Sequence, residues 1–324
     1  MSSVPVVRST MSPIARSWRA YFAPVNRATG VPSVFDPARD GGFILDNPPG
    51  PWLDGGWVQN VNRTAGTKVQ PLRAGMRGAA TAQFRGELEA RIEFDFQQWG
   101  KLQMAVAGGA EQINVLTEAA GSAGAPSGGA AAASVPVQAG STASEIVVGT
   151  AAVGAYAAGD MIAVDVDYTG QLGYVGTGIS AGYAKASAGL TSDFIRRVTF
   201  NIGRVAQTTA ASLILAQPLI GRTPAANARV QKVVAFADRE GGSFFQEWSG
   251  LFVFDGESGG RICFYYPRLQ PCAPAGEHLW EIASPLRSIT LHANLLALPF
   301  ADPNDGEPVL CWRTYFPAST AAVY

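Results

Sequence analysis

The stretch Glu87–Phe96 reads Glu-Leu-Glu-Ala-Arg-Ile-Glu-Phe-Asp-Phe, with a charged residue at every odd position and an apolar residue at every even one. Because side chains alternate across a pleated strand, this pattern predicts a β-strand with two opposite faces. The apolar face consists of Leu88, Ala90, Ile92, Phe94 and Phe96. The charged face consists of Glu87, Glu89, Arg91, Glu93 and Asp95. Such a strand suits either an ordinary surface sheet or a barrel or ring whose polar side borders water.

Other segments on both sides of this strand also have the composition of strands. Before it, strands are predicted at Gly56–Val61 and Lys68–Leu72, joined to it by a glycine-containing connection around Arg73–Ala80. Near the end of the chain, long strands are predicted at 243–254, 261–269 and 288–298. Ile14–Phe22, which contains Trp18 and Tyr21, is predicted as a short helix.

A helix is predicted directly after the alternating strand. Asp95 is followed three residues later by Gln98, which is a capping-box arrangement. Trp99, Leu102 and Val106 then fall at helical spacing and are expected to pack this helix against the sheet. The helix should end at Gly108-Gly109 and be followed by a strand at 112–116.

The middle of the chain predicts an inserted domain. Residues 119–142 are almost entirely Ala, Gly, Ser and Pro, a composition that predicts a flexible connector. After it, short segments separated by turns predict a small β-barrel or sandwich, with strands at 145–148, 161–168, 195–202, 212–215 and 229–236. The predicted organisation is therefore a core domain in two parts, 1–118 and 237–324, interrupted by the connector 119–142 and an inserted β domain, 143–236.

Composition narrows the classes of function. Of the 324 residues, 47% are hydrophobic and only 15% are charged, which favours a subunit whose surface is covered by self-association. The net charge is −1 and the chain has no Lys/Arg cluster, so stable binding to nucleic acid is not expected. No long apolar segment is present, so neither a signal peptide nor a membrane span is expected.

Motifs for catalysis or cofactor binding are weak. The three cysteines include no Cys-x-x-Cys pair and are predicted to be buried thiols, with no disulfide, metal or cofactor. Gly256–Gly260 matches the G-x-S-x-G pattern, but a strand rather than a helix follows it, so a hairpin turn is predicted. The pairs Glu87 with Glu89 and Asp165 with Asp167 share strand faces, and solvated charge explains them better than glycosidase chemistry. An enzyme is not expected.

Several stretches resemble the major tail tube proteins of tailed bacteriophages. In the first flank these are Trp52–Asn60, Gly66–Arg73, Glu87–Phe96 and Trp99–Met104. In the second flank they are 238–248 and 264–269. The resemblance covers about two thirds of the chain and leaves out the insert.

This resemblance implies a mainly β fold, with a tail-tube-type sandwich or barrel and one packed helix. It also implies hexameric rings that stack into a tube for genome ejection. Glu87, Glu89, Arg91, Glu93 and Asp95 would then line the lumen, where like charge repels DNA phosphates. The connection containing Arg73, Gly75, Met76, Arg77 and Gly78 would reach the next ring, and the insert would lie outside the tube.

The implied partners are further copies of the chain, other tail proteins (a terminator and a baseplate or tip) and transiently passing DNA, with no membrane. The implied location is the virion tail, after synthesis in the bacterial cytoplasm. Two alternatives remain open: another virion shell component, such as a capsid or decoration protein, and a carbohydrate-binding or carbohydrate-active β protein.

Overall fold

The structure of this chain is a computed structural model. It describes residues 15–25, 29–36, 44–74, 79–121, 130–167, 171–175, 179–180, 182–184, 193–241, 246–256, 259–272, 276–283 and 286–317. Strands account for 57% and helices for 7% of these described residues, and the sheets are antiparallel. The predicted mainly β fold class is therefore confirmed.

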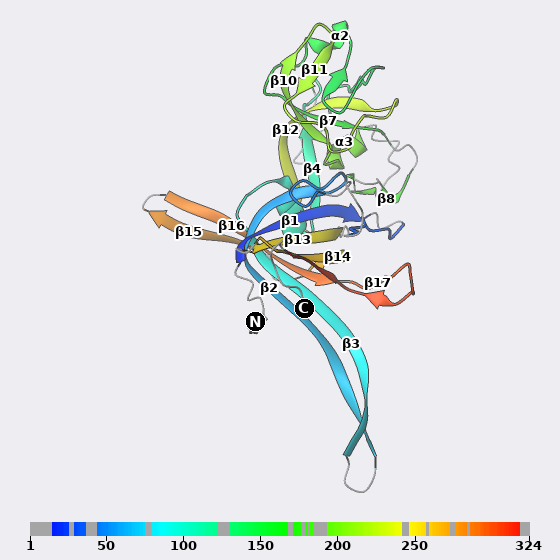
Figure 1. The fold of residues 1–324 in the computed structure, drawn as a ribbon. Coiled ribbons are helices and arrows are strands. Elements are labelled where there is room, and N and C mark those ends of the chain that lie inside the picture. The colour runs from blue at the N-terminus through cyan, green and yellow to red at the C-terminus, as the bar shows by residue number, and fades with distance from the viewer. Residues whose placement is uncertain are drawn as a thin grey trace, which may run out of the picture.

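Six strands close into a barrel (Figure 1). They are β1 (Ala15–Val25), β2 (Leu53–Ala74), β3 (Ala79–Phe96), β13 (Glu247–Gly256), β14 (Arg261–Pro271) and β16 (Leu286–Ala297). Their order is β16-β3-β2-β1-β13-β14, and pairing of β14 with β16 from Leu269↔Ala297 to Pro271↔Leu295 closes the ring. Two further strands, β15 (Gly276–Ala283) and β19 (Trp312–Phe316), extend the sheet at its edges.

Aromatic side chains fill the barrel. In β3, Ala90, Ile92, Phe94 and Phe96 are all at most 2% exposed, as their alternation predicts. The ring of Phe94 lies 5.0 Å from that of Phe96 and 5.3 Å from that of Phe252. Burial of such large apolar surfaces is the main stabilising term available to this domain.

The helix predicted at residues 14–22 is wrong, because residues 15–22 belong to strand β1. Trp18, Ala20 and Phe22 contact the barrel core, whereas Tyr21 and Ala23 belong to a second cluster on the opposite face of the same strand. A strand buried on both faces has a nearly continuous apolar sequence, which lacks the alternation that identifies strands.

Helix α1 (Lys101–Gly108) closes one end of the barrel. Leu102 and Val106 lie in the barrel core, but Trp99 precedes the helix and is 45% exposed, so its predicted packing role is wrong. The capping box is also wrong, since the N-cap is Gly100 without a side-chain cap. The predicted stop is confirmed: Gly109 has φ 62° and donates its N–H to the Ala105 carbonyl.

A second sheet is formed by the inserted segment together with β4. Its order is β4 (Glu111–Leu116), β12 (Arg229–Arg239), β7 (Met161–Asp165), β10 (Ile202–Thr208), β11 (Ser212–Leu215) and β6 (Glu145–Val147), with β5 (Val135–Pro136) paired to β12. Val137 donates to the Ala228 carbonyl and Gln138 to the Val147 carbonyl, which joins the β5 side to β6. The sheet thus curls around its own apolar cluster.

Short elements complete the described chain. They are α2 (Thr150–Val153), β8 (Gly173–Val175), β9 (Gly182–Ala184), α3 (Phe194–Val198), β17 (Phe300–Ala301) and β18 (Pro308–Val309). The strand predicted at 195–202 is wrong in its first half, which is α3. Its Arg197 forms an i,i+4 ion pair with Asp193 at 2.9 Å, while Ile195 and Val198 pack into a local cluster.

The described part of the segment predicted as a flexible connector is hydrogen-bonded, first to residues that follow β4 and then to the insert. Ala119 donates to the Ala130 carbonyl and Ala132 to the Thr117 carbonyl, and Val137 lies in the insert core. Backbone hydrogen bonds therefore order a segment whose side chains are small. Residues 122–129 lie outside the described chain.

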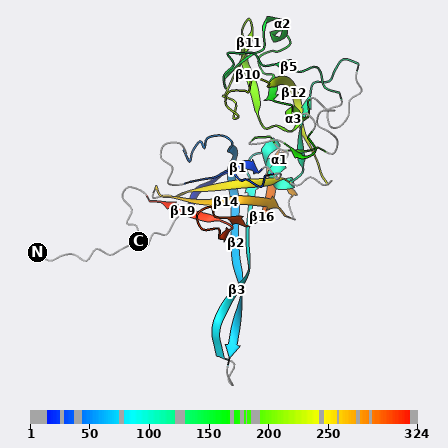
Figure 2. The same ribbon diagram turned by 90° about the vertical axis from the view of Figure 1, so that its right-hand side faces the viewer.

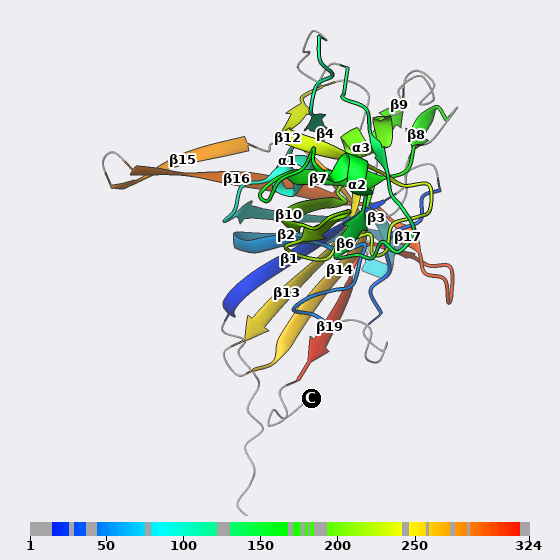
Figure 3. The same cartoon turned by 90° about the horizontal axis from the view of Figure 1, so that it is seen from above.

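The molecule is elongated. Figures 1 and 2 show the inserted sheet at one end of the barrel and the β2–β3 hairpin projecting from the other end. Figure 3, seen from above, shows the β15–β16 hairpin reaching sideways from the barrel.

Candidate assembly surface

The β2–β3 hairpin continues well beyond the barrel. Ala90 is 2% exposed, but the next residue on the same face, Leu88, is 52% exposed, so the barrel ends between them. We call the part beyond, Gly66–Ala74 with Ala79–Glu89, the arm. Its two strands stay paired as far as Ala74↔Ala79, which corresponds to about 30 Å at the usual rise per residue.

Both faces of the arm carry exposed apolar side chains. Val69 and Leu88 lie on the face that continues the barrel interior, and they are 46% and 52% exposed. Leu72 and Phe84 lie on the opposite face, and they are 50% and 59% exposed. A two-stranded ribbon that is apolar on both sides is suited to insertion between other protein surfaces.

A β-bulge explains why the alternating sequence pattern starts where it does. The register passes from Thr67↔Leu88 to Val69↔Arg85, so that Gly86 and Glu87 together face Lys68. The bulge adds one residue to β3. Odd-numbered residues before it therefore lie on the face that even-numbered residues occupy after it, and the alternation that starts at Glu87 does not continue into the preceding residues.

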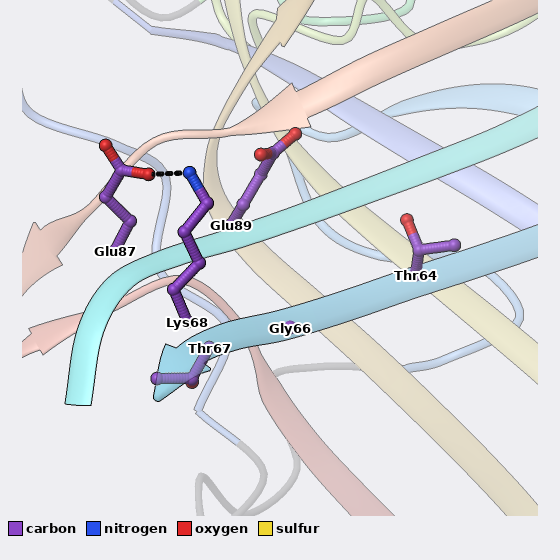
Figure 4. A pocket seen from close by; sticks show the side chains of 6 residues that line it. All are labelled: Thr64, Gly66, Thr67, Lys68, Glu87 and Glu89. Carbon is purple, nitrogen blue, oxygen red and sulfur yellow. Dashed lines mark hydrogen bonds and ion pairs between the residues drawn. The ribbon is translucent and has the colours of Figure 1, made fainter. Parts of the chain in front are cut away.

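The carboxylates on the charged face of β3 have cationic and polar partners, some from β3 itself and others from neighbouring strands. In the arm, Lys68 forms an ion pair with Glu87, and Arg91 Nε donates to Glu89 Oε1 at 2.5 Å. Lys68, Glu87 and Glu89 border an open hollow on the outer face of the hairpin, which Thr64, Gly66 and Thr67 also line (Figure 4). Glu87 and Glu89 are therefore exposed and paired with cations, which does not favour a catalytic carboxylate pair.

Nearer the barrel, β2 and β16 supply the partners. Asn294 Nδ2 donates to Glu93 Oε1 at 3.2 Å, and Asn60 Nδ2 donates to Asp95 Oδ2 at 2.7 Å. The other oxygen of Asp95 lies 2.8 Å from His292 Nδ1. Sequence alone gave His292 no acidic neighbour, because Asp95 lies 197 positions away and comes close only through the β3–β16 register.

The predicted lumen-lining residues thus share one face, which is less acidic than the isolated strand suggests. Across this face, four carboxylates are accompanied by Lys68 and Arg91, which leaves a formal net charge of −2 when histidine is counted as neutral. Of the predicted inter-ring residues, Arg73 lies exposed near the end of β2. Gly75, Met76, Arg77 and Gly78 lie outside the described residues.

The β15–β16 hairpin offers a second projecting surface. Leu279 is 67% exposed and Ile289 is 43% exposed, and these residues face each other in the register. β15 is also an edge strand of the eight-stranded sheet, and β19 is the other edge. Unpaired edges with exposed apolar side chains favour association with another chain.

The remaining sequence motifs have structural roles in the described chain. Gly259 donates to the Gly256 carbonyl in a tight turn, as predicted for this segment. Asp167 pairs with Arg196, and burial raises the pKa of its carboxyl despite that partner. Burial also raises the pKa of the free Cys263 thiol to about 12, so this thiol is poorly suited to act as a nucleophile.

Neither a protein-family model nor a curated protein sequence matches this chain. Among the described residues, no helix has the length and apolar character needed to cross a membrane.

Proposed function

We propose that this chain is a structural protein of a bacteriophage tail that assembles with copies of itself into stacked rings, forming the tube through which DNA leaves the virion. In this proposal the protein carries out no catalysis. The main support for the proposed self-assembly is the arm, a long two-stranded hairpin with apolar side chains on both faces.

The physical argument starts from the instability of isolated hairpins. A two-stranded ribbon in water is at best marginally stable, and the arm is too long to be supported by its own barrel. Burial of Val69, Leu88, Leu72 and Phe84 against neighbours would contribute about 25 cal/mol for each Å² of apolar surface removed from water. A second copy of the chain is the proposed neighbour, which agrees with the 15% content of charged residues.

The charged face of β2, β3 and β16 supports the conduit role. Its carboxylates are held by neighbouring residues, and the face retains a small excess of negative charge. Negative charge on a wall repels phosphates and so limits adhesion of passing DNA. We propose that this face borders the lumen and that the inserted sheet lies on the outside.

Electron microscopy of the purified protein is the direct test. We expect rings or hollow tubes of constant bore. Spherical shells would favour the capsid alternative, and monodisperse monomers at high concentration would contradict self-assembly altogether.

A pair of variants tests the role of the arm. Leu88→Lys places a charge on an apolar face of the arm, and we expect it to abolish tubes while leaving the monomer folded, because Leu88 is already half exposed. Gln207→Lys is the matched control, since it adds the same charge at an exposed polar position of β10 in the inserted sheet, away from the arm. Equal assembly of both variants would show that the apolar faces of the arm are not buried in the assembly.

A further inference from the structure

A buried polar joint connects the inserted sheet to the barrel. Lys101, only 8% exposed, is the first residue of α1, the helix that closes the barrel end. Its Nζ donates to Asn114 Oδ1 at 2.8 Å and to the backbone carbonyl of Thr199. The same nitrogen lies 4.3 Å from the centre of the Phe200 ring. One side chain of the barrel end thus contacts both β4 and the segment that follows α3.

Asn114 reinforces this joint from β4. Its Nδ2 donates to the carbonyl of Arg196 at 2.7 Å and to that of Thr199 at 2.9 Å. These carbonyls belong to the C-terminal end of α3, where helical carbonyls have no donors within their own helix. Lys101 and Asn114 therefore donate hydrogen bonds to buried backbone acceptors at the end of α3.

The segment Thr199-Phe200-Asn201 connects the two units through alternating side chains. Thr199 Oγ1 donates to Asp165 Oδ2 at 2.6 Å, and Asn201 Nδ2 donates to the Val164 carbonyl at 2.8 Å, both within the insert. Phe200 instead belongs to the barrel core and packs edge to face on Trp248, with ring centres 5.7 Å apart. Three consecutive residues are thus anchored alternately in the insert, the barrel and the insert.

We propose that Lys101 and the clip Thr199–Asn201 form a lock that holds the inserted sheet in one fixed orientation on the barrel, with Lys101 as the positioning residue. Without this lock the ribbon of β4 and β12 would be a principal link between the units. A two-stranded ribbon bends and twists easily, so the insert would swing. With the lock, the insert is a rigid extension of the barrel. The proposal concerns the single chain and does not depend on assembly.

Hydrogen exchange of the unmodified protein gives the first test. The amide of Phe200 donates to the Ile179 carbonyl, and that of Ile202 donates to the Phe200 carbonyl. We expect both amides to exchange as slowly as those of β13 in the barrel. Exchange at the rate of the exposed turn near Asn304 would show that the joint is open in solution and would overturn the lock.

The variant Lys101→Met gives the second test. Methionine keeps an unbranched side chain of similar reach but cannot donate to Asn114 or to Thr199. We expect the amides of 199–202 to exchange at least about tenfold faster, with β1 and β13 unchanged. Solution X-ray scattering should also change from a profile fitted by one conformation to one that requires a spread of insert orientations.

Lys232→Met is the matched control, because Lys232 is a lysine of the insert that pairs with Asp160 away from the joint. It should leave both measurements unchanged. If Lys101→Met folds poorly, Phe200→Leu replaces it and tests the lock by reducing the packing of residue 200 in the barrel core. It should speed hydrogen exchange of the 199–202 amides in the way expected for Lys101→Met. Equal acceleration throughout the barrel, or no change at the clip in either variant, would overturn the positioning role.

Discussion

At the scale of single residues, the polar partners in this protein come from distant parts of the chain. The sequence predicts which side chains of β3 face outward, since alternation depends only on local geometry. It does not predict that Asp95 contacts Asn60 and His292, because these pairs depend on sheet register. For the same reason Asp95 was expected to cap a helix, whereas its carboxylate is engaged between strands. The sequence does not predict the burial of Lys101, because a lysine at the start of a helix is ordinarily exposed.

Burial of Lys101 makes a prediction about pH. Desolvation lowers the pKa of its amine well below the ordinary 10.5, so the folded state binds fewer protons there than the unfolded state does. The free energy of unfolding should therefore rise with pH between the lowered folded pKa and 10.5, by up to about 1.4 kcal/mol per pH unit.

Urea denaturation of the unmodified chain and of Lys101→Met, at pH 7 and pH 10, measures this effect. The difference in stability should shift in favour of the unmodified chain at the higher pH, because only that chain carries the amine. A difference that stays constant would show that Lys101 is equally protonated in both states.

At the scale of elements, one strand performs two tasks. The inner half of β3 contributes side chains to the barrel core, and its outer half is one of the two strands of the arm. Alternation identified the inner half readily. The outer half, before the bulge at Gly86 and Glu87, lacks a consistent pattern because both of its faces are partly apolar. Strand β1 was predicted as a helix for the same reason, because both of its faces are buried and its sequence does not alternate. Helix α3 was predicted as part of a strand because it contains β-branched residues, but local packing favours a helical turn.

Two phenylalanines of β3 should separate these tasks. Phe94→Ala removes a fully buried ring and should lower the free energy of unfolding by about 3–5 kcal/mol. Phe84→Ala removes a ring that is 59% exposed and should change monomer stability by less than about 0.5 kcal/mol while weakening assembly. Denaturation curves and sedimentation of the two proteins compare the effects directly. Similar losses of stability would mean that the arm folds back onto its own barrel.

At the scale of the whole molecule, the division into two flanks and an insert stays a prediction, whereas the mainly β fold class follows from the sequence. The closure of the barrel by β14 and β16 does not, because it depends on pairings between strands without a local signature. The sequence predicts two strands joined by a connection around Arg73–Ala80 that would reach the next ring, but it does not predict β15, so the β15–β16 hairpin was missed. The proposed function depends most on the β2–β3 arm. The inner position of the charged face in an assembly remains a prediction.

Charge reversal tests that position. In assembled tubes, Glu87→Lys, Glu89→Lys and Glu93→Lys together should turn a repelling wall into one that retains DNA, with retention falling steeply as salt is raised. Co-sedimentation of tubes with short DNA fragments measures it. Glu307→Lys is the control, since Glu307 is exposed near β18 and away from this face. Tubes of the triple variant that retain no DNA would place the charged face elsewhere.

The arm and the inserted sheet lie at opposite ends of the barrel (Figure 1), and this arrangement gives the subunit a direction. A stack of subunits that all point the same way is a polar filament with two chemically different ends. One end presents unbound arms, and the other presents the unoccupied surfaces to which the arms of a further ring would bind. Growth at the two ends would then proceed at different rates, and the proteins that start and stop the filament would need unrelated binding surfaces.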